Sequence, residues 1–236
     1  MMTELTLPII GYMHSSYKEK FGIPRQPNLV QVESYIEMLA PYNDVLAFEG
    51  IEAFSHLWLV WQFHDNKNPE KNQFRPQVRP PRLGGNKKIG VFATRSMYRP
   101  SQIGLSVVRL KCVKKEGKSV RVYVTGSDLL DGTPIVDIKP YIHYSDAVIN
   151  AESGYAQDEP KRKSVIWSDR AIEQKQQLLM SEKLSVQTAQ ELEAVLSLDP
   201  RPAYQDDEAR VYKMKFAAVD IAFTVGETTV NITAVE

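Results

Sequence analysis

The middle of the chain carries the side chains best suited to contact a polyanion. Residues 71–115 contain twelve Lys or Arg and no Asp or Glu, although the protein of 236 residues is formally neutral. A stretch of one sign attracts phosphate-rich ligands. Pro80-Pro81 and Gly84-Gly85 restrict its backbone. It also contains aromatic side chains on which bases could stack: Phe74, Phe92 and Tyr98. We interpret it as a surface for a nucleic acid or nucleotide on a rigid β scaffold; a solvated basic face without a ligand is the alternative.

Other polar residues follow predicted strands or turns. His64-Asp65 come directly after the apolar run from Leu57 to Phe63, where they could meet a ligand; an ordinary surface histidine is the alternative. Three carboxylates appear just beyond the basic stretch: Asp128, Asp131 and Asp137. Asp131-Gly132 is also a common turn pair, so turn formation alone would explain it.

Two segments hold an arginine between prolines, which keeps the backbone extended and rigid. The first is Pro24-Arg25-Gln26-Pro27, and the second is Asp199-Pro200-Arg201-Pro202-Ala203-Tyr204. In the second segment Tyr204 offers a stacking surface with a polar tip. A purely structural turn explains this second segment equally well.

Several classes of protein do not fit the sequence. Cys112 is the only cysteine, which excludes an internal disulfide and fits a reducing cytoplasm. The histidines are too scattered for metal-ligand spacing, so we expect no metal site. No apolar run approaches the ~18 residues of a membrane span, and we expect no membrane partner.

The hydrophobic patterns predict a mainly β first part. Strands are expected at residues 5–12, 57–63, 89–94, 105–113, 119–126 and 135–141, with residues 30–39 ambiguous. The run from Leu57 to Phe63 suits a strand buried on both faces. Glu116-Gly117-Lys118 predicts a hairpin between two of these strands.

The pattern changes after a polar segment at residues 150–163. Helices are expected at about 170–183 and 185–196, the first capped by Ser168-Asp169, and strands at 211–225 and 229–235. We therefore predict two domains: residues 1–160, rich in β structure, and residues 161–236, with an α+β fold.

The motifs taken together resemble one family, the TrmO (YaeB, TsaA-like) tRNA methyltransferases. The matching stretches cover essentially the whole chain: Pro24-Arg25-Gln26-Pro27, residues 53–58, residues 79–86, residues 90–96 with Arg99-Pro100, residues 128–141 and residues 199–204. The resemblance implies a single-sheet antiparallel β-barrel that binds S-adenosylmethionine. It also implies methylation of N6 of threonylcarbamoyl-adenosine, next to the anticodon of a tRNA for threonine, and a homodimer with the cofactor near the subunit interface. The absence of a G-x-G-x-x-G motif agrees with a cofactor site outside a Rossmann fold.

The resemblance also assigns residues to roles. The implied cofactor site comprises Pro24, Arg25, Gln26, His64, Asp65, Arg95, Leu105, Asp128, Leu129, Leu130 and Asp131. We add a set expected to bind substrate: Arg79, Arg82, Asn86, Lys88, Tyr98, Arg201 and Tyr204. One departure is that the family's Arg-Pro-Asn-Pro-Ile-Gly reads Arg99-Pro100-Ser101-Gln102-Ile103-Gly104 here.

The chemistry itself narrows the catalytic candidates. Methyl transfer from a sulfonium is an in-line displacement, so alignment supplies much of the rate. The N6 nitrogen of a urea is a poor nucleophile and must lose a proton. Asp137 and the loop carboxylates are candidates for the base, and Arg95, Arg99 and Lys139 for charge stabilisation. A non-catalytic RNA-binding β-barrel and a cofactor-binding enzyme of different chemistry are the competing classes.

Overall fold

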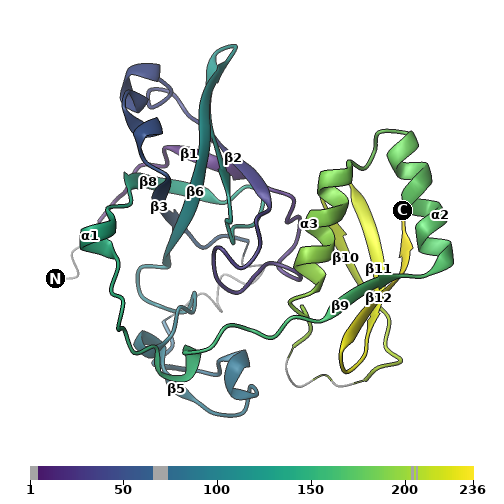
Figure 1. Ribbon diagram of the computed structural model, residues 1–236. Coiled ribbons are helices and arrows are strands. Elements are labelled where there is room, and N and C mark those ends of the chain that lie inside the picture. Colours follow the sequence, from purple (N-terminus) through teal and green to yellow (C-terminus); the bar gives the residue numbers. More distant parts are fainter. Residues whose placement is uncertain (1–4, 66–73, 203–204, 206) are drawn as a thin grey trace.

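The computed structural model describes residues 5–65, 74–202, 205 and 207–236. It shows a β-barrel in the first part of the chain and a four-stranded sheet with two helices in the last part (Figure 1). The mainly β fold with a smaller α+β part is as predicted. No helix in these ranges is long and apolar enough to cross a membrane.

Six antiparallel strands close the barrel in the order β1-β2-β7-β6-β3-β8, with β8 pairing back to β1. Their bounds are β1 Gly11–His14, β2 Glu33–Met38, β3 His56–Gln62, β6 Ile103–Glu116, β7 Ser119–Thr125 and β8 Pro134–Pro140. The predicted hairpin joins β6 to β7, and Gly117 at its tip has a φ of 63°, which a glycine adopts without steric cost. A closed barrel pairs every strand edge and so gives a rigid support for loops.

The alternation of side chains along each strand fills the barrel. Leu57, Leu59 and Trp61 of β3 point inward, together with Val108 of β6 and Val122 of β7. The prediction that β3 is buried on both faces was wrong, because its outward residues are only partly covered. In a barrel the outer face of a strand meets solvent or a neighbouring loop rather than a second layer.

Two predicted strands are shorter than expected. The first strand begins only at Gly11, since Leu5 and Leu7 are exposed and unpaired. The expected strand at residues 89–94 is a two-residue strand, β5 Ile89–Gly90, paired with β4 Gln77–Val78, followed by a 3₁₀ turn at Val91–Ala93. Residues 74–102 of the basic stretch, called the basic loop below, thus lie beside the barrel (Figure 1). Residues 103–115 belong to β6.

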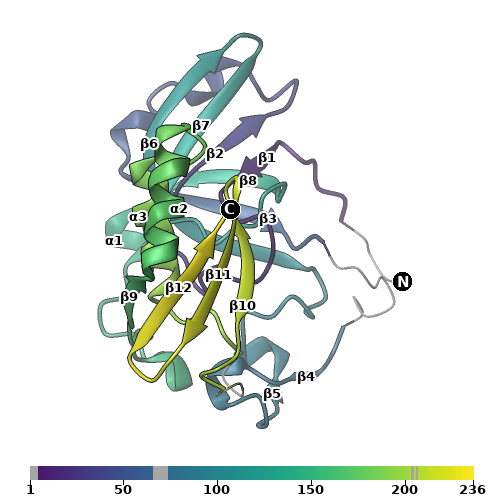
Figure 2. The same cartoon turned by 90° about the vertical axis from the view of Figure 1, so that its right-hand side faces the viewer.

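The last part of the chain forms a sheet in the order β10-β11-β12-β9, with two helices on one face (Figure 2). Its elements are β9 Ser164–Trp167, α2 Asp169–Met180, α3 Val186–Leu196, β10 Tyr212–Phe216, β11 Val219–Val225 and β12 Thr229–Val235. Both helices begin at serine caps, as predicted for Ser168: Ser168 Oγ accepts from the N–H of Ala171, and Ser185 Oγ from that of Thr188. β9, parallel to β12, was not predicted, because four residues carry too little periodicity to reveal a strand.

The two parts share a hydrophobic core at their junction. Tyr17, Val30 and Val32 of the first part are buried among residues of α3 and the second sheet. The backbone N–H of Ala217 donates to the carbonyl of Ser16 at 2.8 Å. The division near residue 160 therefore stays a prediction, since this core contains residues from both sides of it.

One short element follows the barrel. Helix α1, His143–Asp146, leads into an extended segment that runs toward the basic loop, where Tyr155 Oη donates to the carbonyl of Ala93. This segment connects the barrel to the second sheet.

Candidate functional site

A cavity of about 460 Å³ opens where several loops meet beside the barrel. Its walls come from residues 20–26, the strands β3 and β6, the loop at residues 95–99, and residues 128–133. Trp61, Phe63 and Leu130 supply apolar wall, and charged side chains from separate loops converge on it. A cavity that is apolar with a few convergent charges is the usual form of a small-molecule site.

Polar contacts tie the loops of the cavity to one another. Arg95 Nη1 donates to Gln26 Oε1 at 2.5 Å, which joins the basic loop to the proline-framed loop. Lys20 Nζ donates to the carbonyl of Asp65 at 2.5 Å. His64 Nδ1 lies 3.3 Å from the hydroxyl of Thr133. These contacts hold four segments, distant in sequence, around one space.

Asp128 is the one acidic side chain among the described residues that line the cavity. Its Oδ1 accepts from the hydroxyl of Ser106 at 2.6 Å, and Trp61 Nε1 donates to that hydroxyl at 3.0 Å. Burial raises the pKa of Asp128 above its ordinary value, while the Ser106 hydrogen bond, its own backbone and the charge of Arg95 oppose the shift. The carboxylate is therefore held at the cavity wall at a desolvation cost that a cationic ligand would relieve.

Most residues expected to bind the cofactor lie around this cavity. Eight of the eleven line it: Pro24, Arg25, Gln26, His64, Arg95, Leu105, Asp128 and Leu130. Asp65 takes part through its carbonyl, as described above.

Two of the eleven lie elsewhere, which corrects that expectation for their side chains. Leu129 is fully buried in the barrel core, because alternation along residues 128–130 turns it inward. Asp131 faces away from the cavity, where its Oδ1 accepts from the N–H of Ser15 and its Oδ2 pairs with Lys18 Nζ, both at 2.9 Å.

The three residues expected in catalysis are divided between two places. Arg99 lines the cavity, and its Nη1 donates to the carbonyl of Thr94 at 3.1 Å. Asp137 and Lys139 form an ion pair of 2.8 Å on β8, outside the cavity, and their side chains are 45% and 65% exposed. Lys139 is the cross-strand partner of Trp58, which does line the cavity.

The residues expected to bind substrate through the basic loop lie on an exposed surface. Arg79, Arg82, Asn86 and Lys88 are exposed around the 3₁₀ helix Pro81–Leu83. Tyr98 is less exposed, and the guanidinium of Arg75 lies 4.0 Å from the centre of its ring. Phe74 and Phe92 form an exposed aromatic pair with their ring centres 6.2 Å apart. Cations and aromatic rings thus share one loop next to the cavity.

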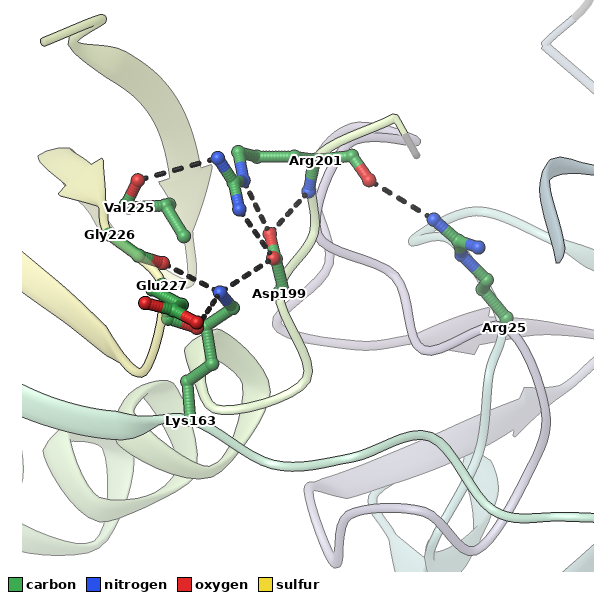
Figure 3. A network of polar contacts seen from close by, with 7 residues as sticks. All are labelled: Arg25, Lys163, Asp199, Arg201, Val225, Gly226 and Glu227. Atoms are coloured by element: carbon green, nitrogen blue, oxygen red, sulfur yellow. Dashed lines mark hydrogen bonds and ion pairs between the residues drawn. The ribbon is translucent and has the colours of Figure 1, made fainter. Parts of the chain in front are cut away.

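Arg201 does not lie on a surface open to substrate, which corrects the expectation for its side chain. It is 8% exposed, and its Nε and Nη2 each donate to Asp199 at 2.9 Å (Figure 3). Its Nη1 donates to the carbonyl of Val225 at 3.3 Å. The guanidinium is turned into its own domain because a carboxylate two residues earlier matches its fork. Tyr204 lies outside the described residues.

Sequence reasoning missed part of the cavity wall. The cavity is also lined by nine residues that the sequence did not predict: Lys20, Ile23, Trp58, Trp61, Phe63, Met97, Ile103, Gly104 and Thr133. The available signal was Trp58, a large aromatic residue on the outward side of β3, which a barrel strand facing only solvent would not need.

The start of β6 shows how this chain departs from the family pattern. A Cβ on Gly104 would come within 2.3 Å of the ring of Trp61, so glycine is required for the ring to pack there. Gln102 has a φ of 51°, which a proline ring cannot adopt, and its backbone N–H donates to the carbonyl of Arg99. The loop before β6 therefore takes a path that the family's proline would exclude.

A closed barrel with a charged cavity beside a basic, aromatic loop defines a small-molecule-binding barrel with a surface for a polyanion. Family models identify it further: the tRNA-methyltransferase O N-terminal domain matches residues 12–147, and the TrmO C-terminal domain matches residues 160–236. The chain belongs to the TrmO family.

Individual relatives and solved structures agree with this assignment. The chain is 44% identical over 208 residues to the tRNA (adenine(37)-N6)-methyltransferase of Escherichia coli, covering 88% of this chain and 86% of that protein. It is 44% identical over 223 residues to a putative S-adenosylmethionine-dependent methyltransferase, RcsF, of Pseudomonas aeruginosa, covering 93% and 92%. The crystal structure of TrmO from Pseudomonas aeruginosa superposes with a TM-score of 0.78 at 34% identity, over 100% of this chain and 99% of that one.

Proposed function

We propose that this protein transfers a methyl group from S-adenosylmethionine to N6 of the adenosine next to the anticodon of tRNA. The substrate we propose is the threonylcarbamoyl-adenosine of a tRNA for threonine. The observation that carries the proposal is the cavity, where arginines and one partly desolvated carboxylate converge on apolar wall directly beside an exposed basic loop.

The residues of the cavity fit the proposed cofactor by chemistry. S-adenosylmethionine carries a carboxylate, two cationic groups and an adenine ring, and it supplies a methyl group activated on sulfur. Arg25 and Arg95 are donors suited to a carboxylate, and Asp128 suits a cationic group. Among the described residues Arg25 has no carboxylate partner, so its charge is available to a ligand. Trp61, Phe63 and Leu130 offer apolar surface for the ring.

The protein's part in the reaction is alignment and charge stabilisation. Arg99 lines the cavity, and its guanidinium, positioned by the carbonyl of Thr94, can stabilise negative charge that develops on the urea of the substrate. The walls of the cavity would hold a bound methyl donor in one orientation, which favours an in-line displacement.

We propose that the substrate approaches past the pair formed by Asp137 and Lys139. Both side chains leave the outer face of β8, and Trp58, next to Lys139 across the strands, lines the cavity. We propose that Asp137 accepts the proton that N6 loses, with the Lys139 ammonium 2.8 Å from its carboxylate. Hydrogen bonding to Asp137 raises the pKa of Lys139, so the lysine stays a cation beside it.

The basic loop is the proposed surface for tRNA. Exposed Arg79, Arg82 and Lys88 can contact phosphates, and the pair Phe74 and Phe92 can stack on unpaired bases of an anticodon loop. A tRNA substrate agrees with the cytoplasmic location expected from the single cysteine.

We further propose a homodimer. The segment after β8 exposes large apolar side chains, with Tyr144 and Ile149 each 90% exposed and Val148 71% exposed. A second copy of the chain would cover this surface. Light scattering of the purified protein tests it, and a monomer at micromolar concentration would contradict it.

The function is tested by single-turnover methylation. Transcripts or tRNA carrying threonylcarbamoyl-adenosine should accept a methyl group from labelled cofactor, and the same tRNA with unmodified adenosine should not. The purified protein should also unfold at a higher temperature when S-adenosylmethionine is present. Binding to tRNA without thermal stabilisation by the cofactor would indicate the non-catalytic RNA-binding alternative.

A further inference from the structure

A partly buried polar network in the last part of the chain reaches the cavity of the first part. The carboxylate of Asp199 lies at its centre and accepts from the guanidinium and the backbone N–H of Arg201 (Figure 3). Lys163 Nζ lies 3.5 Å from the same carboxylate and donates at 2.6 Å to the carbonyls of Gly226 and Glu227. Two cations thus fasten one carboxylate to the turn between β11 and β12.

This network fixes the backbone around Arg201. Asp199 has a φ of 50°, in the left-handed region, and Pro200 and Pro202 restrict the residues that follow. Because the side chain of Arg201 is held on one side, its carbonyl projects from the other. That carbonyl accepts from Arg25 Nη2 at 3.1 Å (Figure 3).

The position of the Arg25 side chain depends on this hydrogen bond to the last part of the chain more than on contacts within the first part. The carbonyl of Arg201 is its one hydrogen-bond partner among the described residues, and it pairs with none of their carboxylates. The pKa of Arg25 is lowered, chiefly by desolvation; Asp199 opposes the shift and Arg82 adds to it. A long flexible cation without a local partner would otherwise sample many rotamers, and each would lose alignment with a ligand.

We infer that Asp199, Arg201 and Lys163 form a positioning network for Arg25, through which the C-terminal part of the chain sets the affinity of the cavity for the cofactor. The inference rests on the proposed function, since it requires Arg25 to contact the bound cofactor. Arg201 acts through its backbone carbonyl, while its side chain is held by Asp199 and Val225. The last part of the chain therefore shapes the cofactor site, although none of its described side chains lines the cavity.

The test is a double-mutant cycle on the affinity for S-adenosylmethionine, measured by calorimetric titration of the whole chain. Asp199→Asn keeps the size and the tolerance for a positive φ, and it removes the charge that fastens Arg201 and Lys163. We expect Arg25→Ala to weaken binding about tenfold or more and Asp199→Asn about fivefold. In the Arg25→Ala background, Asp199→Asn should add less than about twofold, because the group it positions is gone.

A second measurement separates positioning from general damage. At saturating cofactor, Asp199→Asn should restore the wild-type rate of methyl transfer, so that only the KM for the cofactor rises. Glu193→Gln is the matched control, since Glu193 of α3 pairs with Lys175 and Trp167 in the same part of the chain, away from Arg25. It should leave the affinity for the cofactor unchanged.

Each outcome decides between the two proposals. An Asp199→Asn effect that is equally large with and without Arg25 overturns the positioning network, as does an unchanged affinity in Asp199→Asn. Unchanged affinity in Arg25→Ala instead refutes the proposed cofactor role of Arg25. If Asp199→Asn does not fold, Pro200→Ala, which loosens the backbone and removes no polar partner, takes its place in the cycle with the same expected pattern.

Discussion

Arg25 and Arg201 are separated by 176 positions, each lies in a proline-framed loop, and a hydrogen bond joins the two. Arg201 is buried and bidentate to Asp199, whereas Arg25 is exposed at the cavity and pairs with no carboxylate of the described residues. Prolines make both loops rigid, and the presence or absence of a neighbouring carboxylate decides the role of each arginine. An arginine with its own carboxylate serves the fold, and one without it is available to a ligand.

The distinction between a structural Arg201 and a ligand-binding Arg25 is wrong if both contribute equally to the free energy of unfolding. Arg201→Ala leaves Asp199 with Lys163 as its remaining cation and should lower the free energy of unfolding by roughly 3 kcal/mol, the low end for a broken buried pair. Arg25→Ala should cost less than about 1 kcal/mol, since Arg25 forms one hydrogen bond to a carbonyl and no ion pair among the described residues. Urea unfolding measures both, and comparable losses in the two variants would show that Arg25 is also structural.

The second prediction concerns Arg95, which resembles Arg25 in its exposure and its place at the cavity. Arg95→Ala should weaken S-adenosylmethionine binding by roughly tenfold, because the variant has neither a charge-assisted hydrogen bond to the ligand nor the link to Gln26. Calorimetric titration is the measurement. Arg170→Ala, on the exposed side of α2, is the control and should bind as wild type. Unchanged affinity in Arg95→Ala would remove that residue from the site.

The third prediction concerns the affinity of the basic loop for tRNA. Replacing Arg79, Arg82 and Lys88 together by Ala should weaken tRNA binding and lower the slope of log affinity against log salt by roughly one for each phosphate that the variant no longer neutralises. Filter binding at several salt concentrations tests this prediction. A triple variant of Arg170, Lys183 and Lys213, exposed cations of the last part of the chain, is the control. A slope unchanged from wild type would make the loop a solvated basic face.

The smallest expected effect comes from a second pair of matched groups, the carboxylates of Asp128 and Asp199. Although burial alone would raise the pKa of Asp199, the hydrogen bonds and charge of Arg201 and the charge of Lys163 lower it; burial raises the pKa of Asp128. A raised pKa means that Asp128 contributes stability at low pH that is lost as the pH rises through its folded-state pKa. Asp199 contributes stability above its unfolded pKa, which is lost as the pH falls.

The wild type should lose stability as the pH rises above 3.8, the ordinary pKa of an aspartic acid. Asp128→Asn should not show this loss, and it should be slightly more stable than the wild type at neutral pH. Its amide oxygen can still accept from Ser106. Urea unfolding of the variant and the wild type from acid to neutral pH measures the difference. A variant that loses stability with pH as steeply as wild type would show that Asp128 is not desolvated in the free protein.

Much of the fold followed from local patterns in the sequence. Alternating β-branched residues predicted most barrel strands, Glu116-Gly117-Lys118 predicted the hairpin, and Ser168-Asp169 marked the start of the first long helix. These features depend on neighbours a few residues away, so the chain alone contains them. The short strand β9 escaped because its partner, β12, lies some sixty positions later.

The candidate site was predicted in part, through motifs rather than geometry. The resemblance to the family placed Arg25, Arg95 and Asp128 together, and the structure puts all three at one cavity. It could not distinguish Asp131 or Leu129, which adjoin these residues and face elsewhere, because side-chain direction reverses at each position of an extended segment.

By itself, then, the sequence determined the β-rich and α+β parts, the rigidity of both proline-framed loops and the basic character of residues 71–115. The tertiary structure alone decided which arginine is buried, which carboxylate is desolvated and which residues of β3 line the cavity. Charge pairing and burial depend on atoms brought together from distant positions, and only the closed barrel and its contact with the second sheet bring them together.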